Sequence, residues 1–352
     1  MTATPSVELD RFAFELPSAL EATEPPEAHG LVRDSVRMLV TCLGSRSLVP
    51  STFQHLPTFL APGDLVVINT SATIPAAIDA AGDDGTLLVV HLSSELDDGR
   101  WIVEPRRLER GIATRWQGPP PTPRLHLSGG GTLWLDEPLD GCGRLFIARL
   151  ELDQPVLAWL GVHGRPIRYG HVSRRWPIEM YQNVYATEPG SAEMPSAGRP
   201  FTDAILTRLA ATGIGVAPIV LHTGVASLEG DELPYPERVE VPATTASKIN
   251  AARAAGGHVI AVGTTVVRAV ESAVGPDGQV RSLNGWTDLV ITPDHEMRAV
   301  DGMITGWHAP VSSHLFMLEA MLGRELLFDS YNAALAMGYR WHEFGDSHLI
   351  VP

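Results

Sequence analysis

The chain is short of cysteine, long apolar runs and positive charge, and each shortage excludes a class of protein. Its two cysteines, Cys42 and Cys142, are too far apart for a disulfide framework or a closely spaced zinc site. No stretch approaches the roughly 18 uninterrupted apolar residues that a membrane helix needs. The first residues, Met1 to Arg11, lack the basic start and apolar run of a signal peptide. We therefore expect a cytoplasmic protein with no membrane partner.

The charge balance is acidic, with 26 Lys and Arg against 41 Asp and Glu and a net charge of −15 at pH 7. An acidic protein repels nucleic acid on average, so an RNA partner would need a local basic patch. The 352 residues, 44% of them hydrophobic, are enough to bury the core of one or two globular domains. The composition counts against an RNA partner without excluding one.

A change in character between residues 77 and 153 indicates a separate domain. Between turns rich in glycine, proline and aspartate lie short β-type runs at 87–91, 101–103, 133–135 and 145–148. Strands at this spacing are typical of small antiparallel β-structure. The triple glycine at 129–131 precedes no helix, so it predicts a hairpin turn rather than a phosphate loop. We predict a barrel-like antiparallel domain at 77–153, inserted into a main domain formed by 1–76 and 154–352.

After residue 200, helical and extended patterns alternate. Thr202 can cap a helix that stops near Gly213, and the apolar run 214–221 reads as a buried strand. A second strand is expected at 258–262, with a helix on either side of it along the chain. This alternation predicts an α/β main domain with helices around a mixed, largely parallel sheet.

Polar residues follow three of the expected strands. They are His222, the pair Thr264-Thr265, and His308. Ligands bind beyond the carboxyl ends of parallel strands, so we expect these side chains to meet in a site at one edge of the sheet.

Several motifs, taken in order, resemble a known enzyme family. They are Pro62–Asn69, Ile74-Pro75-Ala76, Tyr181–Ala186, Pro195–Gly198, Leu221-His222, Ala261–Thr265, Val267-Arg268, Glu271-Ser272, His308-Ala309-Pro310, and Tyr339-Arg340 with Phe344-Gly345-Asp346. Together they are similar to the S-adenosylmethionine:tRNA ribosyltransferase-isomerases of queuosine biosynthesis over nearly the whole chain. That family also carries a small β-domain after the Ile-Pro-Ala block.

The resemblance implies an unusual use of S-adenosylmethionine as a co-substrate, without a metal. The family transfers and isomerises its ribosyl portion onto 7-aminomethyl-7-deazaguanine in tRNA, forming epoxyqueuosine and releasing adenine and methionine. The reaction needs a base at C5′, an acid for adenine and a neutral acceptor amine. The resemblance implies catalytic roles for His222, His308 and Asp346. It implies substrate or cofactor binding by Asn69, Tyr181, Ser196, Gly198, Glu237, Gly263, Thr264, Thr265, Arg268 and Glu271.

Each candidate also has a structural interpretation. A lone histidine such as His222 is often a core residue, and His308 could cap a helix. Gly263-Thr264-Thr265 could be a plain strand–helix turn, and Asp346 follows a glycine as turn residues do. Arg268 and Glu271 are three residues apart on one helix, so they could form an ion pair in which Glu271 orients Arg268. Glu237 could equally lie at the surface.

The chain departs from the family pattern near the expected site. The family's Asn-Asn-Thr-Arg reads Asn69-Thr70-Ser71-Ala72, and its Leu-His-Phe reads Arg199-Pro200-Phe201. The family arginine is replaced by Ala72, and loss of a guanidinium that can bind an anion through two hydrogen bonds is not a conservative change. The segment 165–176 interleaves aromatic residues with four cations, which are candidate RNA contacts or a solvated loop: Arg165, Arg168, Arg174 and Arg175.

Three functions therefore remain open from the sequence. The first is the family reaction on tRNA, and the second is a diverged enzyme that uses S-adenosylmethionine with a small-molecule acceptor. The third is a non-catalytic protein that binds a nucleoside or RNA. The assignment of base and acid to His222 and His308 is not fixed by the sequence, nor is the oligomeric state. We expect His222→Ala and His308→Ala each to reduce turnover more than stability.

Overall fold

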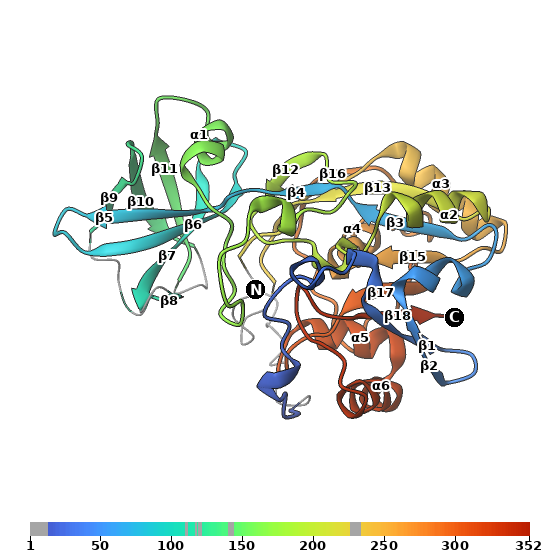
Figure 1. Cartoon of the computed structure of the whole chain (residues 1–352). Helices are drawn as coiled ribbons and strands as arrows, with labels where there is room; N and C mark the ends of the chain where they lie inside the picture. The colour runs from blue at the N-terminus through green and yellow to red at the C-terminus, as the bar shows by residue number, and fades with distance from the viewer. Residues whose placement is uncertain (1–12, 110–111, 117, 119–121, 140–143, 226–233) are drawn as a thin grey trace.

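The structure is a computed structural model that describes residues 13–109, 112–116, 118, 122–139, 144–225 and 234–352. Two large sheets dominate it, a nine-stranded sheet and a seven-stranded sheet that closes into a barrel. The barrel projects to one side of the main body (Figure 1). No helix among the described residues is long and apolar enough to cross a membrane.

The nine-stranded sheet has the order β16-β14-β13-β3-β15-β17-β18-β1-β2. Its strands are β1 (Arg37–Cys42), β2 (Ser47–Thr52), β3 (Leu65–Asn69), β13 (Gly215–Leu221), β14 (Glu237–Val241), β15 (Val259–Val262), β16 (Leu283–Thr287), β17 (Gly302–Gly306) and β18 (Ser347–Val351). The run β13-β3-β15-β17 and the pair β18–β1 are parallel. The remaining four pairs are antiparallel. The sheet is therefore mixed, and the prediction that it is largely parallel is not confirmed. Part of the reason is local, because the short turn between β1 and β2 can join only antiparallel strands.

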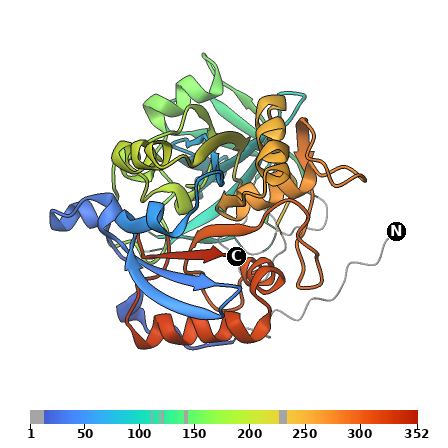
Figure 2. The same ribbon diagram turned by 90° about the vertical axis from the view of Figure 1, so that its right-hand side faces the viewer.

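Helices cover both faces of this sheet. They are α2 (Asp203–Ala211), α3 (Ala243–Ala254), α4 (Thr264–Ser272), α5 (His314–Leu322) and α6 (Arg324–Ala336). Ile205 and Leu209 of α2 pack in one apolar core, while α3, α4, α5 and α6 contribute to the other. The expected cap is present, since the side chain of Thr202 accepts a hydrogen bond from the N–H of Ile205. The C-terminal helix α6 runs along one end of the molecule (Figure 2).

The barrel matches the antiparallel, barrel-like structure expected from the sequence. Its strands are β5 (Ala77–Gly82), β6 (Leu87–Glu95), β7 (Trp101–Glu109), β8 (Ile112–Arg115), β9 (Arg124–Leu127), β10 (Thr132–Pro138) and β11 (Phe146–Glu151). Pairing of β11 with β7 closes six of the strands into a ring, and every pairing is antiparallel. The glycines 129–131 form the turn between β9 and β10 with φ of 98°, 95° and 91°, as predicted for a hairpin.

Short elements complete the structure. The helix α1 (Val156–His163) and the paired strands β4 (Ser71–Thr73) and β12 (Glu188–Ser191) lie in the segments between the two bodies. The 3-10 turns of the described residues are η2 (Ser18–Leu20), η3 (Pro26–His29), η4 (Arg33–Ser35), η5 (Phe53–Phe59), η6 (Ile178–Tyr181) and η7 (Ser196–Gly198). The barrel is tied to the segment after β13, because Arg144 donates to the carbonyl of Val225 at 3.1 Å and Ser93 accepts from the N–H of Val225. These contacts hold Val225 beside the barrel.

Candidate functional site

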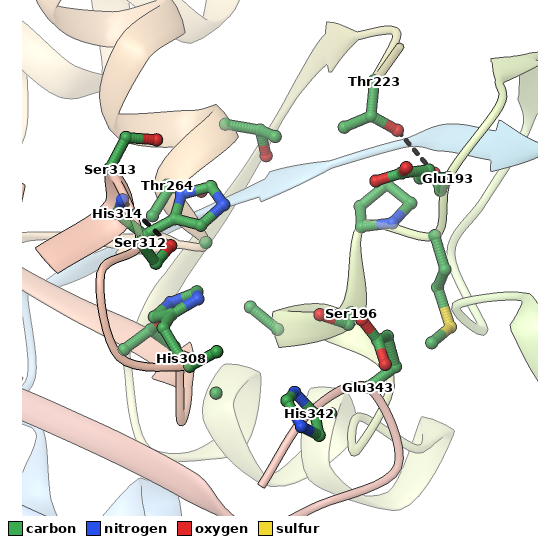
Figure 3. Close-up of a pocket in the computed structure, with 18 of the residues that line it drawn as sticks. Glu193, Ser196, Thr223, Thr264, His308, Ser312, Ser313, His314, His342 and Glu343 are labelled. Carbon is green, nitrogen blue, oxygen red and sulfur yellow. Dashed lines mark hydrogen bonds between the residues drawn. The ribbon is translucent and has the colours of Figure 1, made fainter. Parts of the chain in front are cut away.

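A cavity of about 710 Å³ opens where β15 and β17 end. The segments that follow both strands line it, as do Thr223 and Gly224 just after β13. The expected meeting of strand ends is therefore present for Thr264, Thr265 and His308. Figure 3 shows His308, His314 and Thr264 on one side of the cavity, with Glu193 and Glu343 on the opposite side. A cavity of this size fits a ligand of nucleoside dimensions.

His308 lies in the cavity wall just beyond β17. Its Nε2 is 2.9 Å from the hydroxyl of Thr305, and its backbone N–H donates to the hydroxyl of Tyr331. Its ring lies against that of His314, with the centroids 4.5 Å apart. Burial, reinforced by His314, lowers the pKa of His308 well below the ordinary value. The imidazole is therefore neutral at pH 7 and can accept a proton.

His314 is a cavity residue that the sequence analysis did not single out. It is the first residue of α5, and burial lowers its pKa to about 4. The loop before it contains Val311, whose φ of 64° is rare for a β-branched side chain. The only sequence signal was a second histidine close to His308, which no periodic pattern distinguishes from a surface residue.

His222 does not line the main cavity. It borders a smaller cavity of about 190 Å³ against the barrel, together with Asp97, Trp101 and Arg238. Its Nδ1 is 2.7 Å from the hydroxyl of Ser71, and that hydroxyl is 2.6 Å from the hydroxyl of Ser191. Ser191 in turn accepts the N–H of Thr223, a residue of the main cavity. His222 and His308 thus border different cavities, and hydrogen bonds through Ser71 and Ser191 link His222 to Thr223 at the main cavity.

The turn between β15 and α4 holds the predicted glycine and threonines. Gly263 has a φ of 93°, and a Cβ there would come 3.2 Å from that of Ala197. Ser196, Gly263, Thr264 and Thr265 all line the cavity. Helix α4 begins at Thr264, and the free N–H groups and the dipole at a helix N-terminus favour an anion or a polar oxygen.

Arg268 lines the cavity, but neighbouring oxygens occupy most of its donors. Its guanidinium forms an ion pair with Glu237 and donates to the carbonyls of Leu289, Tyr235 and Thr287. Glu271 is not its partner, contrary to the interpretation drawn from the three-residue spacing. The Glu271 carboxylate accepts backbone N–H groups of the segment 298–300 instead. The carboxylate that binds Arg268 comes from β14, far away in the sequence.

Four other predicted residues lie outside the cavity lining. Asn69 joins β3 to β13 by exchanging hydrogen bonds with the backbone of Leu221. Tyr181 packs on Phe344 with the ring centroids 5.4 Å apart. At Gly198 a Cβ would come 2.0 Å from the hydroxyl of Tyr185, so only glycine fits. Glu271, described above, is the fourth.

Asp346 also lies outside the lining, and its carboxylate holds the backbone together. One oxygen accepts the N–H of Arg37 at 2.8 Å, and the other accepts the N–H of Arg340 at 2.7 Å. We expect Asp346→Ala to lower the free energy of unfolding by about 1–3 kcal/mol, because two partly buried N–H groups lose their acceptor. Turnover per folded molecule should stay close to that of the wild type. Urea denaturation and activity normalised to folded protein measure the two effects, and a large loss of turnover at unchanged stability would restore the catalytic role.

Of the four basic candidates for RNA contact, at least two are paired with acidic residues. Arg165 forms an ion pair with Asp79, and Arg174 lies 3.5 Å from Glu24 and 4.0 Å from the ring of Trp176. Arg175 is exposed and Arg168 is half-buried. In the same segment, Tyr169, Gly170 and His171 line the cavity, which the sequence analysis did not anticipate.

A group of acidic and histidine side chains lines the cavity opposite His308. Among the described residues, Glu21, His171 and His342 bring ligand atoms within 4.8 Å of one another. The two rings, however, are stacked with their centroids 4.2 Å apart and their planes 20° from parallel. Their lone pairs therefore run side by side instead of converging as the ligands of a metal ion do. Glu193 and Glu343 complete this side of the cavity.

Comparisons with known proteins agree over almost the full length. Residues 9–350 match the family described as "Queuosine biosynthesis protein". The S-adenosylmethionine:tRNA ribosyltransferase-isomerases of Symbiobacterium thermophilum and Synechococcus elongatus are each 36% identical to the chain, covering 97% and 98% of it and 99% and 96% of their own lengths. The crystal structure of the S-adenosylmethionine tRNA ribosyltransferase of Thermotoga maritima superposes with a TM-score of 0.55 at 26% identity, covering 97% of this chain and 99% of that one.

Proposed function

The chain belongs to the queuosine biosynthesis protein family, and we propose that it is a ribosyl transferase-isomerase that consumes S-adenosylmethionine and modifies tRNA. The main support for this function is the 36% identity to two S-adenosylmethionine:tRNA ribosyltransferase-isomerases, which extends over nearly the full length of this chain and of each relative. The cavity at the strand ends supports it, because it combines neutral histidines with a helix N-terminus. The expected product on tRNA is epoxyqueuosine, with adenine and methionine released.

His308 is the best candidate for the base that removes a proton from C5′ of S-adenosylmethionine. The adjacent sulfonium makes that proton acidic, and a half-buried neutral imidazole can accept it. The N-terminus of α4, with Thr264 and Thr265, suits the carboxylate or a ribose hydroxyl of the same molecule. His222 acts in this scheme as a positioning residue through Ser71, Ser191 and Thr223, since its ring borders the smaller cavity.

The barrel is proposed as an inserted domain, residues 77–153, within a main domain formed by residues 1–76 and 154–352. Its closed ring of strands supports that division. Its apolar core is distinct from those of the main sheet, but it also includes Trp159, Leu160 and Val225 from the main domain. A tRNA-modifying enzyme would work in the cytoplasm, where its substrate is.

A second candidate is the same use of S-adenosylmethionine with a small-molecule acceptor. The acidic net charge favours it, as does the pairing of Arg165 and Arg174 with acidic residues, since both features weaken attraction to a phosphate backbone.

The test is to incubate the protein with S-adenosylmethionine, with and without tRNA that bears 7-aminomethyl-7-deazaguanine. Mass spectrometry then follows adenine, methionine and the modified tRNA. Release of adenine and methionine only with that tRNA, with the added ribosyl-derived mass, is the expected result. Breakdown of S-adenosylmethionine without tRNA modification would favour the small-molecule acceptor. Binding without any breakdown, even with that tRNA, would contradict the tRNA reaction and move the search to a small-molecule acceptor or a binding role.

A further inference from the structure

Glu193 is a buried carboxyl group that no neighbour satisfies. Its relative exposure is 5%, and its Oε1 has no hydrogen-bond partner within the described part of the chain. Its backbone is fixed, since its carbonyl accepts the hydroxyl of Thr223 and the N–H of Ala192 donates to the carbonyl of Thr223. The carboxyl group points into the cavity (Figure 3). Buried polar atoms nearly always have a partner, so the missing one indicates a ligand.

The charges around Glu193 are mainly negative. Burial raises its pKa well above the ordinary range, and Glu343, Glu104 and Glu237 raise it further, against the opposing charge of Arg144. Tyr169, the other titratable neighbour, stays protonated because burial raises its pKa as well.

Glu343 differs from Glu193 because a histidine lies directly beside it. Its Oε2 lies 2.9 Å from Nε2 of His171. Burial alone would raise the pKa of Glu343, but His171 and then His342 outweigh burial and lower it. This side of the cavity therefore holds two carboxyl groups in different surroundings, Glu343 beside a histidine and Glu193 among mainly negative charges.

We propose that Glu193 binds the protonated primary amine of a substrate. An ammonium group supplies three N–H donors and a positive charge, which would satisfy Glu193 and offset the repulsion from Glu343. The inference rests on the proposed function, whose two substrates each carry one such amine. One is on the methionine portion of S-adenosylmethionine, and the other is the aminomethyl group of the acceptor base.

Binding changes the protonation of Glu193 in a defined way. The neutral acid releases its proton to solvent as the ammonium group arrives, and the resulting carboxylate pairs with it. If the bound amine is that of the acceptor, the carboxylate then takes one proton from nitrogen. This regenerates the carboxylic acid and leaves a neutral amine that can attack carbon.

The experiment compares wild-type protein with Glu193→Gln by titration calorimetry, without turnover. The two probes are S-adenosylmethionine and the free nucleoside of 7-aminomethyl-7-deazaguanine, each added separately. We expect Glu193→Gln to weaken one probe by about 10- to 100-fold, and the affected probe identifies the amine. Buffers of different ionisation enthalpy should show release of about one proton with that probe in the wild type, and none in the variant. Glu188→Gln is the matched control, because Glu188 is an exposed carboxylate on β12 outside the cavity lining.

A structural role and a binding role for Glu193 predict opposite changes in stability. Glu193→Gln and Glu193→Met remove a buried group without a partner, so their melting temperatures should equal or exceed that of the wild type. Binding of both probes within about two-fold of wild type by folded Glu193→Gln would overturn the proposal, as would a marked loss of stability in both variants. A wild-type protein that binds S-adenosylmethionine but does not break it down even with the modified tRNA would contradict the proposed function, yet the binding comparison would still decide the role of Glu193.

Discussion

His308→Ala is expected to lower turnover by about 10²- to 10⁴-fold while the protein stays folded, which is the range for loss of a positioned general base. The His308 ring lines the cavity, and its nearest polar partner is the hydroxyl of Thr305 at 2.9 Å. Few hydrogen bonds are therefore lost with the side chain. Single-turnover measurement of adenine release from S-adenosylmethionine reports the chemical step directly.

The pH dependence of the wild type checks the same assignment. Burial lowers the pKa of His308 well below the ordinary 6.5, so the ring stays unprotonated through neutral pH. A base must be unprotonated to act, so kcat/KM should hold through the neutral range and fall only on the acid side, below 6.5. Retention of this acid limb in His308→Ala would assign it to another group.

His222→Ala provides the matched comparison. Its ring is linked to the main cavity through two serine hydroxyls and the N–H of Thr223. We expect a smaller loss of turnover than in His308→Ala, because no atom of His222 lies in the main cavity. Equal losses in the two variants would contradict the separation of roles, and unchanged turnover in folded His308→Ala would remove His308 from the mechanism.

The parts of the site that the sequence predicted are those encoded by short, continuous stretches. The apolar runs before Thr264 and His308 mark strands, and parallel strands bring their carboxyl ends to one edge whatever the rest of the chain does. The hairpin at 129–131 and the cap at Thr202 are equally local. The antiparallel pairings of β14, β16 and β18 were not predictable in the same way, since each depends on a partner chosen by packing across the whole sheet.

The parts that the sequence did not predict depend on distant residues. Glu193 and Glu343 come together only because the segment before η7 and the loop before β18 border the same cavity. Neither carboxyl group belongs to a pattern that distinguishes it from a surface residue. The spacing of Arg268 and Glu271 suggested a partnership on one helix, but the loop 298–300 supplies three N–H donors to Glu271. The partner of a charged side chain is decided by all the groups that the fold brings near it. Helical spacing identifies only the candidate on the same helix.

Glu237→Met is expected to lower the free energy of unfolding by about 3–5 kcal/mol, the largest stability effect that we anticipate. Glu237 and Arg268 are both buried and form an ion pair. Removing the carboxylate leaves the guanidinium buried without its counter-charge, and arginine cannot shed its proton to escape that cost. Urea denaturation at neutral pH, followed by fluorescence and by circular dichroism, measures the change.

The reciprocal variant Arg268→Met should cost less, because the remaining carboxyl group can neutralise itself. Burial already raises the pKa of Glu237, against the opposing charge of Arg268, so removing Arg268 raises it further. A carboxyl group whose pKa is higher in the folded state stabilises most below its unfolded pKa, and this contribution is lost as pH rises through the folded value. Arg268→Met should therefore lose stability relative to the wild type as pH rises.

The double variant Glu237→Met/Arg268→Met tests whether the ion pair itself is the cause. Replacing both charges by side chains of similar volume removes the uncompensated charge, so we expect it to be more stable than Glu237→Met alone. The double variant also loses hydrogen bonds, because Arg268 donates to three backbone carbonyls that would then need water as a donor. If the double variant is no more stable than Glu237→Met, those backbone hydrogen bonds, and not the buried charge, dominate the stability of this side of the cavity.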